Sequence, residues 1–141
     1  MKKIVGFFAF ILVVSLATAS FAEVTFVNLS FADALKQAKK ENKLVMVDYY
    51  TTWCGWCKVL DKKTYSNQAV GEYADANLVS LKIDAEKGEG VELVRKSKIQ
   101  GYPTIIFYDG DGKEVSRVVG YVEASAFLER MKMAVSNKAA N

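Results

Sequence analysis

Apolar residues form short runs that are separated by amphipathic segments along most of the chain. An almost unbroken apolar run covers residues 44–50 and predicts a strand that is buried on both faces. Residues 78–84 and 105–108 form two similar runs, and residues 114–119 alternate between apolar and polar positions, so three further strands are expected. A short first strand is predicted over residues 23–28.

Helices are predicted between these strands, where apolar residues recur every three or four positions. The first helix begins after Ser30, which can cap it, and ends near Asn42. The other helices are expected over residues 55–64, residues 66–77, residues 91–96 and a final segment that Ser125 caps and that ends near Val135. The polar tail from Ser136 to Asn141 is expected to fray.

The order of these elements predicts an α/β domain with a mixed sheet. The first half has βαβ character, which requires parallel strands, and the turn Asp-Gly-Asp-Gly over residues 109–112 joins an antiparallel pair. Helices are expected on both faces of the sheet. The chain has 141 residues, which fits one domain, and it has no internal repeat or linker.

The first 22 residues have the three zones of a secretory signal peptide. Two lysines follow Met1, an apolar run of roughly 14 residues extends from Ile4 to Ala17, and small-x-small sites end at Ala19 and Ala22. We expect residues 1–22 to be the signal peptide, with cleavage after Ala22, and residues 23–141 to be the mature domain. An uncleaved N-terminal anchor is the alternative. The mature protein is expected outside the cytoplasm, most simply in a bacterial periplasm.

Charge and composition narrow the classes of function. The formal net charge is +3, and two of these charges belong to Lys2 and Lys3, so the mature chain is nearly neutral and nucleic-acid binding is not supported. The chain has no histidine, which removes the usual general base and the commonest zinc ligand. No metal site and no cofactor are therefore expected.

The chain has two cysteines, Cys54 and Cys57, and they lie between the buried strand over residues 44–50 and the helix that follows it. Two residues separate them, so they can form a disulfide within one helical turn. The first sulfur would lie at a helix N-terminus, where free N–H groups and the helix dipole stabilise a thiolate, the species that attacks disulfides. Structural disulfides normally close longer loops, because this removes more entropy from the unfolded chain. The sequence therefore favours a redox-active pair.

Asp48 interrupts the buried strand. A carboxylate in such an apolar run is costly unless it is paired or protonated. One interpretation is an aspartate at the end of the strand that reaches solvent. The other is a buried carboxyl behind the cysteines, with a raised pKa, that can take or give a proton.

These features resemble the thioredoxin family over nearly all of residues 24–135. The matching residues are Val47-Asp48-Tyr49, Trp53-Cys54-Gly55-Trp56-Cys57-Lys58, Ile83-Asp84, Gly101-Tyr102-Pro103-Thr104, the Asp-Gly-Asp-Gly turn and Gly120. Within the family, residues 34–43 make the chain most similar to exported thioredoxin-like proteins and to the C-terminal domain of the transmembrane disulfide reductase DsbD. The resemblance implies the thioredoxin fold, a mixed central β-sheet flanked by helices on both faces.

The resemblance also implies roles for three residues in the reaction. Cys54 would be the exposed thiolate that attacks, and Cys57 would be the thiol that resolves the mixed disulfide. Asp48 would match the buried carboxylate that handles the second proton.

Five further residues would form the surface that meets the partner. Pro103 would match the cis-proline loop beside the disulfide, where backbone groups of Tyr102 and Thr104 meet the bound partner. Trp53 and Trp56 would border the partner-binding surface, although simple packing is an alternative for each of them.

The chain departs from common cytosolic thioredoxins at two positions. Trp56 replaces the proline between the cysteines, and Ser80 stands where those proteins have a lysine near the buried aspartate. Lys58 could stabilise a thiolate or could simply be solvated. Strongly oxidising relatives often carry a histidine between the cysteines, which stabilises the reduced form, and its absence here indicates a reductant or electron relay.

The sequence therefore predicts an exported thiol–disulfide oxidoreductase that reduces or exchanges protein disulfides, with a membrane electron donor and as a monomer. A periplasmic oxidase or isomerase is the main alternative. A module that binds copper(I) through Cys54 and Cys57, and a non-catalytic binding domain with this fold, are the others.

Overall fold

The computed structural model describes residues 22–139. The signal peptide that the sequence predicts lies outside these residues, except for Ala22, and so does the cleavage site at Ala19. The N-terminal part of the domain boundary therefore stays a prediction. Among the residues described, no helix is both long and apolar enough to cross a membrane.

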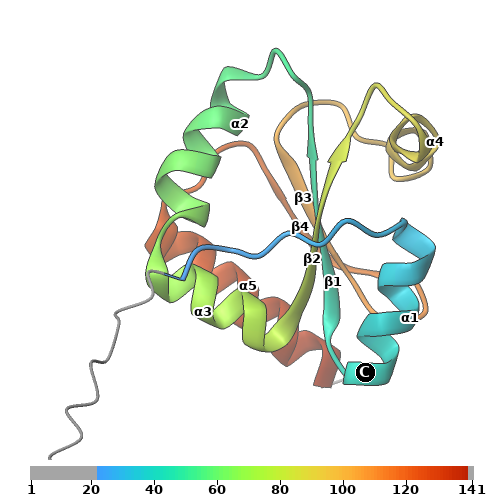
Figure 1. Ribbon diagram of the computed structural model, residues 1–141, viewed down its shortest axis with the longest axis vertical. Coiled ribbons are helices and arrows are strands. Elements are labelled where there is room, and N and C mark those ends of the chain that lie inside the picture. The colour runs from blue at the N-terminus through green and yellow to red at the C-terminus, as the bar shows by residue number, and fades with distance from the viewer. Residues whose placement is uncertain (1–21, 140–141) are drawn as a thin grey trace, which may run out of the picture.

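A four-stranded mixed sheet forms the centre of the fold, in the order β2-β1-β3-β4 (Figure 1). The strands are β1 (Leu44–Tyr50), β2 (Leu78–Asp84), β3 (Thr104–Tyr108) and β4 (Glu114–Val119). β1 pairs in parallel with β2 and antiparallel with β3, which pairs antiparallel with β4. This arrangement confirms the parallel first half and the antiparallel second half that the sequence predicts.

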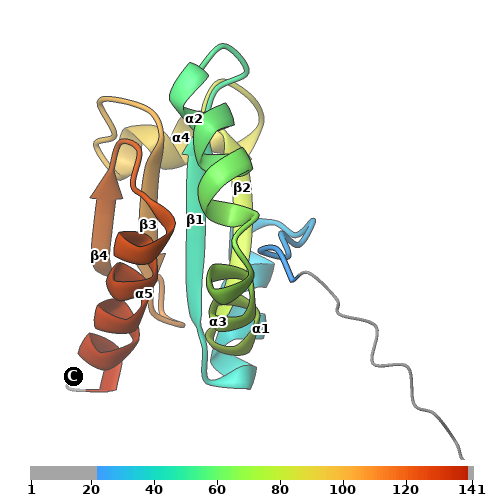
Figure 2. The same cartoon turned by 90° about the vertical axis from the view of Figure 1, so that its left-hand side faces the viewer.

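Helices cover both faces of the sheet, which Figure 1 shows nearly edge-on between them. One layer contains α1 (Phe31–Glu41) and α4 (Glu89–Lys96). The other contains α2 (Gly55–Leu60), its π-helical continuation η1 (Asp61–Tyr65), α3 (Gln68–Asn77) and α5 (Ala124–Ala139), and Figure 2 looks onto this second layer. Two apolar cores result, one on each side of the sheet.

β1 is central because it is apolar on both of its faces. Leu44 and Met46 contribute to the core under α2, α3 and α5, whereas Val45 and Val47 contribute to the core under α1 and α4. Since side chains alternate along a strand, Asp48 lies on the same face as Leu44 and Met46. The sheet therefore directs its one buried carboxylate toward the layer that contains α2.

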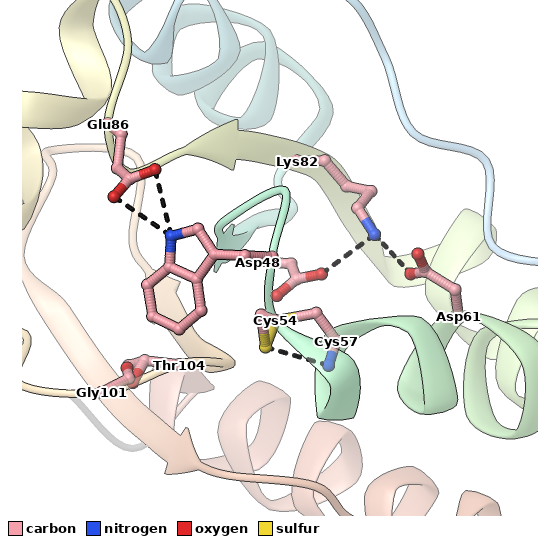
Figure 3. The surroundings of a disulfide bond; sticks show 9 residues. Asp48, Cys54, Cys57, Asp61, Lys82, Glu86, Gly101 and Thr104 are labelled. Atoms are coloured by element: carbon pink, nitrogen blue, oxygen red, sulfur yellow. Dashed lines mark hydrogen bonds and ion pairs between the residues drawn. A yellow bond between two sulfur atoms is a disulfide. The ribbon is translucent and has the colours of Figure 1, made fainter.

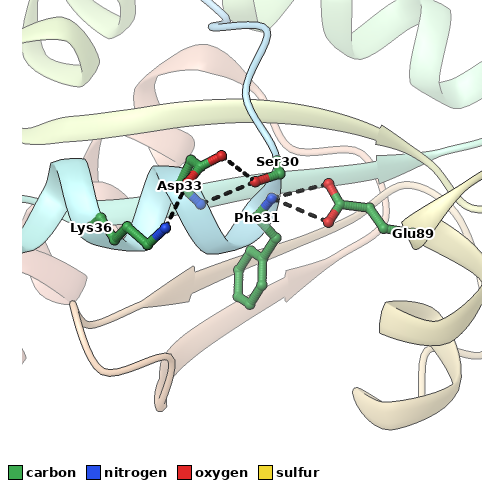
Figure 4. A network of polar contacts seen from close by, with 5 residues as sticks. All are labelled: Ser30, Phe31, Asp33, Lys36 and Glu89. Carbon is green, nitrogen blue, oxygen red and sulfur yellow. Dashed lines mark hydrogen bonds and ion pairs between the residues drawn. The ribbon is translucent and has the colours of Figure 1, made fainter.

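The first helix is fixed at its N-terminus by capping, as the sequence predicts. The Asp33 amide donates to the Ser30 hydroxyl at 3.1 Å, and Lys36 pairs with the Asp33 carboxylate at 2.9 Å (Figure 4). Glu89 at the start of α4 accepts from the Phe31 amide at 3.0 Å. This bond between the starts of two helices joins α1 to α4 on one face of the sheet.

The strand predicted over residues 23–28 does not form. The segment makes one parallel bridge, between Phe26 and Ser80 at the β2 edge. Its preceding amides turn away from β2, because Val24 donates to the Tyr65 carbonyl at 2.9 Å and Thr25 donates to the Asp75 carboxylate at 3.0 Å. The segment is therefore held by the helical layer as well as by the sheet.

Two predictions about the last helix are wrong. α5 begins at Ala124, so Ser125 lies inside it, and the Phe127 amide bonds to the carbonyl of Glu123 at 2.8 Å. Fraying was expected from Ser136 to Asn141, but the chain is helical through residue 139, and residues 140 and 141 lie outside the described part. The Lys138 ammonium donates to the Asn42 carbonyl at 2.7 Å, and this contact with the end of α1 holds the last turn.

Candidate active site

The two cysteines form a disulfide at the start of α2. Cys54 is the N-cap residue, and the Cys57 amide donates to its sulfur at 3.1 Å. In the reduced protein the same N–H group would face a thiolate at this sulfur and stabilise its charge. The arrangement thus distinguishes the two sulfurs, because Cys54 precedes the helix and Cys57 lies within its first turn.

The expected exposure of Cys54 is not seen in the disulfide form. Cys54 is 5% exposed and Cys57 is 3% exposed, so both are buried. The exposed groups are the neighbours of Cys54, since Trp53 and Trp56 on either side of it in the sequence are 66% and 61% exposed. Access to the Cys54 sulfur is therefore narrow and is bordered by two indole rings.

The loop that precedes β3 contains a cis peptide bond between Tyr102 and Pro103, as the resemblance implies. Two hydrogen bonds hold this loop. The Gly120 amide donates to the Pro103 carbonyl at 2.8 Å, and the Thr104 hydroxyl donates to the Gly101 carbonyl at 2.8 Å. Thr104 is buried, so its side chain supports the loop, whereas Tyr102 is partly exposed.

Aromatic pairs extend from the disulfide in two places. Trp53 meets Tyr102 edge-to-face, with ring centroids 6.2 Å apart, and Trp56 stacks on Tyr121, with centroids 5.5 Å apart. The Trp53 indole N–H also donates to the Glu86 carboxylate, at 3.2 and 3.3 Å to its two oxygens (Figure 3). Because each indole is held by a second group, both rings are exposed yet oriented.

Asp48 is fully buried, which excludes the solvent-reaching interpretation. Its pKa is raised from the ordinary value of 3.8 to about 6, chiefly because the carboxyl is buried, and the negative charge of Asp61 contributes to the rise. The Lys82 ammonium, 3.4 Å from the Asp48 carboxylate, acts in the opposite direction and lowers the pKa. A carboxyl with this pKa is largely ionised at neutral pH and accepts a proton readily.

Lys82 bridges two carboxylates, because it pairs with Asp61 as well as with Asp48 (Figure 3). Its ammonium also lies over three aromatic rings, 5.1 Å from the centroid of Tyr50, 5.4 Å from that of Phe26 and 5.6 Å from that of Tyr65. The charge is therefore fixed by attraction to two anions and three ring faces.

Common thioredoxins have a lysine at the position of Ser80, and in this chain Lys82, two residues later, takes its place. In the parallel register Asp48 lies opposite Lys82, and Ser80 lies opposite Met46. Ser80 and Lys82 share a face of β2 because side chains alternate along a strand. The alternation could have identified Lys82 from the sequence once Asp48 was placed on that face.

A cavity of about 270 Å³ connects this cluster with the surface. The residues that line it are Glu23, Val24, Phe26, Asp61, Tyr65 and Lys82. Asp61 and Lys82 are both partly exposed, whereas Asp48 is not. The cavity therefore gives solvent access to Lys82 and Asp61, and Lys82 is the ion-pair partner of the buried Asp48.

Sequence reasoning missed five residues of the site: Asp61, Tyr65, Lys82, Glu86 and Tyr121. Asp61 follows Cys57 by one helical turn, a spacing that places both residues on the same helix face. Glu86 and Tyr121 lie in loops, where periodicity gives no signal. In the part of the chain that the structure describes, no group of three acidic or cysteine side chains is placed to hold a metal ion.

Known proteins match this chain over most of its described length. A family model described as a thioredoxin-like domain matches residues 31–134. The thiol:disulfide interchange protein DsbD of Yersinia enterocolitica is 38% identical over 102 residues, which cover 70% of this chain and 17% of that protein. The same protein of Vibrio vulnificus is 32% identical over 121 residues, covering 81% of this chain and 20% of that one. The chain thus spans about a fifth of these relatives.

Solved structures give the same picture. A candidate disulphide-isomerase from Bacteroides thetaiotaomicron is 44% identical, with a TM-score of 0.73, and the match covers 83% of this chain and 97% of that protein. The reduced C-terminal domain of DsbD from Neisseria meningitidis is 27% identical, with a TM-score of 0.61, and the match covers 72% of this chain and 91% of that domain.

Proposed function

The chain belongs to the thioredoxin-like family, and on this premise we propose that it is an exported thiol–disulfide oxidoreductase that reduces or exchanges disulfides in protein partners. The observation that carries the proposal is the Cys54–Cys57 disulfide at the start of α2, with the Cys57 amide on the Cys54 sulfur at 3.1 Å. This geometry gives one sulfur of the pair a stabilised thiolate after reduction. Similarity to proteins named for thiol:disulfide interchange supports the same chemistry.

The reaction begins at Cys54. Its thiolate attacks one sulfur of a partner disulfide, a mixed disulfide forms, and the other partner sulfur leaves as a thiolate. Cys57 then gives its proton to the Asp48 carboxylate and attacks the Cys54 sulfur. The bond between Cys54 and the partner breaks, the partner's second sulfur leaves, and two electrons have passed from the cysteine pair to the partner.

Asp48 acts as the base of this second step. Its pKa of about 6 leaves it ionised at neutral pH yet basic enough to accept the Cys57 proton. Asp61 lies one helical turn after Cys57 and is joined to Asp48 through Lys82, so the helix face that carries Cys57 is directed toward the carboxylate. The neutral Asp48 then loses its proton to solvent, on the side where its partner Lys82 lines a cavity open to the surface.

The partner surface is formed by the cis-proline loop and the two aromatic pairs. A partner segment that passes the disulfide meets backbone groups of Tyr102 and Thr104 on one side. Trp53 and Trp56 offer oriented apolar faces for the residues that flank the partner cysteine. Protein disulfides are therefore the substrates that this surface fits best.

We place the protein at the reducing end of the family, recharged by a membrane electron donor after export. The dipeptide between the cysteines, Gly55-Trp56, carries no charge that would stabilise the reduced form selectively. Equilibration with glutathione and dithiothreitol series should give a reduction potential on the order of −200 to −270 mV. A value near the roughly −120 mV of strongly oxidising DsbA would overturn the reducing direction.

Disulfide isomerisation is the second candidate, supported by the similarity to the Bacteroides thetaiotaomicron protein. Recovery of activity from a scrambled disulfide substrate, measured without added reductant, separates the two functions. An isomerase restores native pairing with no net change in the thiol content of the substrate. A reductase raises the thiol content of the substrate by two for each Cys54–Cys57 pair that becomes oxidised.

A further inference from the structure

Tyr65 is a buried group for which the reaction described above has no use. It is the last residue of η1, and its ring packs edge-on against Phe26, with centroids 5.1 Å apart, and against Phe127, with centroids 5.7 Å apart. The Lys82 ammonium lies over the same ring. Because three neighbours hold the ring and the residue is 3% exposed, the hydroxyl has little freedom to turn away.

The Tyr65 hydroxyl and the Asp48 carboxylate are buried polar groups that make no hydrogen bond within the described residues. Throughout residues 22–139, neither the Tyr65 hydroxyl nor the two Asp48 oxygens has a hydrogen-bond partner. The Lys82 ammonium is an ion-pair partner of Asp48 at 3.4 Å, which is longer than a good hydrogen bond. Buried polar groups are nearly always paired in proteins, so an unused donor beside unused acceptors calls for an explanation.

The two groups lie close enough to change each other's pKa. The negative charge of Asp48 raises the pKa of Tyr65, whose burial already raises it, and the Tyr65 hydroxyl lowers the pKa of Asp48. Tyr65 ends the π-helical turn, whose hydrogen bonds join residues five apart, and both Tyr65 and Leu60, five residues before it, are buried. Such turns are frequent at functional sites.

We propose that Tyr65 is a positioning residue for Asp48. The Tyr65 hydroxyl donates a hydrogen bond to the ionised Asp48 carboxylate and holds it in place. The proposal rests on the proposed function, in which Asp48 accepts the Cys57 proton. Tyr65 keeps its own proton throughout and takes no part in bond making. The hydrogen bond from Tyr65 makes the carboxylate a weaker base, so Asp48 is ionised, and able to accept the Cys57 proton, at lower pH. The same hydrogen bond weakens once Asp48 is neutral.

The groups around Asp48 that set its pKa come from a few elements. The titratable and charged ones are Lys82 of β2 and Asp61 and Tyr65 of η1, whereas β3 places the uncharged Ile105 opposite Asp48. Cys57 of α2 is held in the disulfide in the oxidised protein. Lys82 and Tyr65 favour the ionised form, and Asp61 and burial favour the neutral form. Removing the Tyr65 hydroxyl therefore has one expected sign, a higher pKa for Asp48.

The test is an NMR titration of the Asp48 carboxyl carbon in the oxidised protein, with and without the substitution Tyr65→Phe. Phenylalanine keeps the ring and its packing and removes only the hydroxyl. We expect the acid dissociation constant of Asp48 to fall by about tenfold, the size of a hydrogen bond to a charged group. An unchanged dissociation constant in a folded Tyr65→Phe protein would overturn the proposal.

Tyr49→Phe is the matched control. Tyr49 is equally buried, but its hydroxyl lies in the core on the other side of β1, 3.0 Å from the Tyr108 hydroxyl. Its loss should leave the Asp48 titration unchanged, and a shift as large as that of Tyr65→Phe would also overturn the proposal. The Asp48→Asn protein, in which the signal must vanish, confirms the assignment.

Kinetics separate this proposal from the proposed function. The titration uses the oxidised protein and needs no turnover, so it reports on Tyr65 and Asp48 alone. Resolution of a mixed disulfide at Cys54 should shift its pH midpoint upward in Tyr65→Phe by the same factor. A shifted titration with an unshifted midpoint would support the hydrogen bond from Tyr65 and remove Asp48 from the proposed reaction.

Discussion

Replacing Asp48 by asparagine should stabilise the protein above neutral pH. The unfolded chain loses the Asp48 proton near pH 3.8, whereas the folded protein keeps it until about pH 6 because the carboxyl is buried. A raised pKa in the folded state means that stability is fully present below pH 3.8 and is lost as pH rises through 6. Since one pKa unit corresponds to about 1.4 kcal/mol, the loss amounts to about 3 kcal/mol above pH 7.

Asparagine has nearly the same shape as aspartic acid and does not ionise. The Asp48→Asn protein should therefore match the wild-type stability near pH 4 and exceed it by about 3 kcal/mol near pH 8. Urea unfolding of both oxidised proteins, followed by far-UV circular dichroism between pH 4 and pH 8, measures this difference. The other carboxylates contribute equally to both proteins, so the difference isolates Asp48.

An exposed aspartate provides the control. Contacts with Lys36 and Ser30 lower the pKa of Asp33, so Asp33→Asn should not stabilise the protein at neutral pH. Parallel curves for the wild-type and Asp48→Asn proteins over the whole pH range would refute the argument that burial of Asp48 is costly.

Three further changes test other parts of the structure. Lys82→Met removes the cation that lowers the pKa of Asp48, so an NMR titration should place that pKa above 6. Gly90→Ala should destabilise the fold by about 1–3 kcal/mol in urea unfolding, because its Cβ would lie 1.9 Å from the Asp84 carbonyl oxygen. N-terminal sequencing of the protein from an exported fraction should begin at Glu23, and a soluble cytoplasmic protein with an intact Met1 would contradict export.

Most of the fold can be predicted from the sequence because each strand has a pattern of its own. The run over residues 44–50 is apolar on both faces, which only a central strand tolerates, and the turn over residues 109–112 fixes its neighbours as a hairpin. The errors lie at the ends of the domain. There the Lys138 contact with Asn42 and the Val24 bond to the Tyr65 carbonyl decide the structure, and these contacts join residues far apart in the sequence.

The site was only half predictable for the same reason. The cysteine pair, Asp48 and the cis-proline loop follow from local motifs, whereas the cation that neutralises Asp48 depends on the register between two strands. Common thioredoxins have this lysine at the position of Ser80, which lies opposite Met46 here. In this chain the lysine is Lys82, which lies directly opposite Asp48. Tyr65 depends on a π-helical turn that no apolar spacing reveals.

The difference between the two sulfurs is the claim on which the proposed reaction depends, and partner trapping tests it most directly. Cys57→Ser should leave attack by Cys54 intact and remove resolution, so partners linked to Cys54 should accumulate in the exported fraction. Cys54→Ser should trap almost none, because Cys57 lies within the first helical turn, whereas Cys54 caps the helix and its sulfur accepts the Cys57 amide. Equal trapping by the two variants would contradict the assignment of Cys54 as the attacking sulfur and the mechanism built on it.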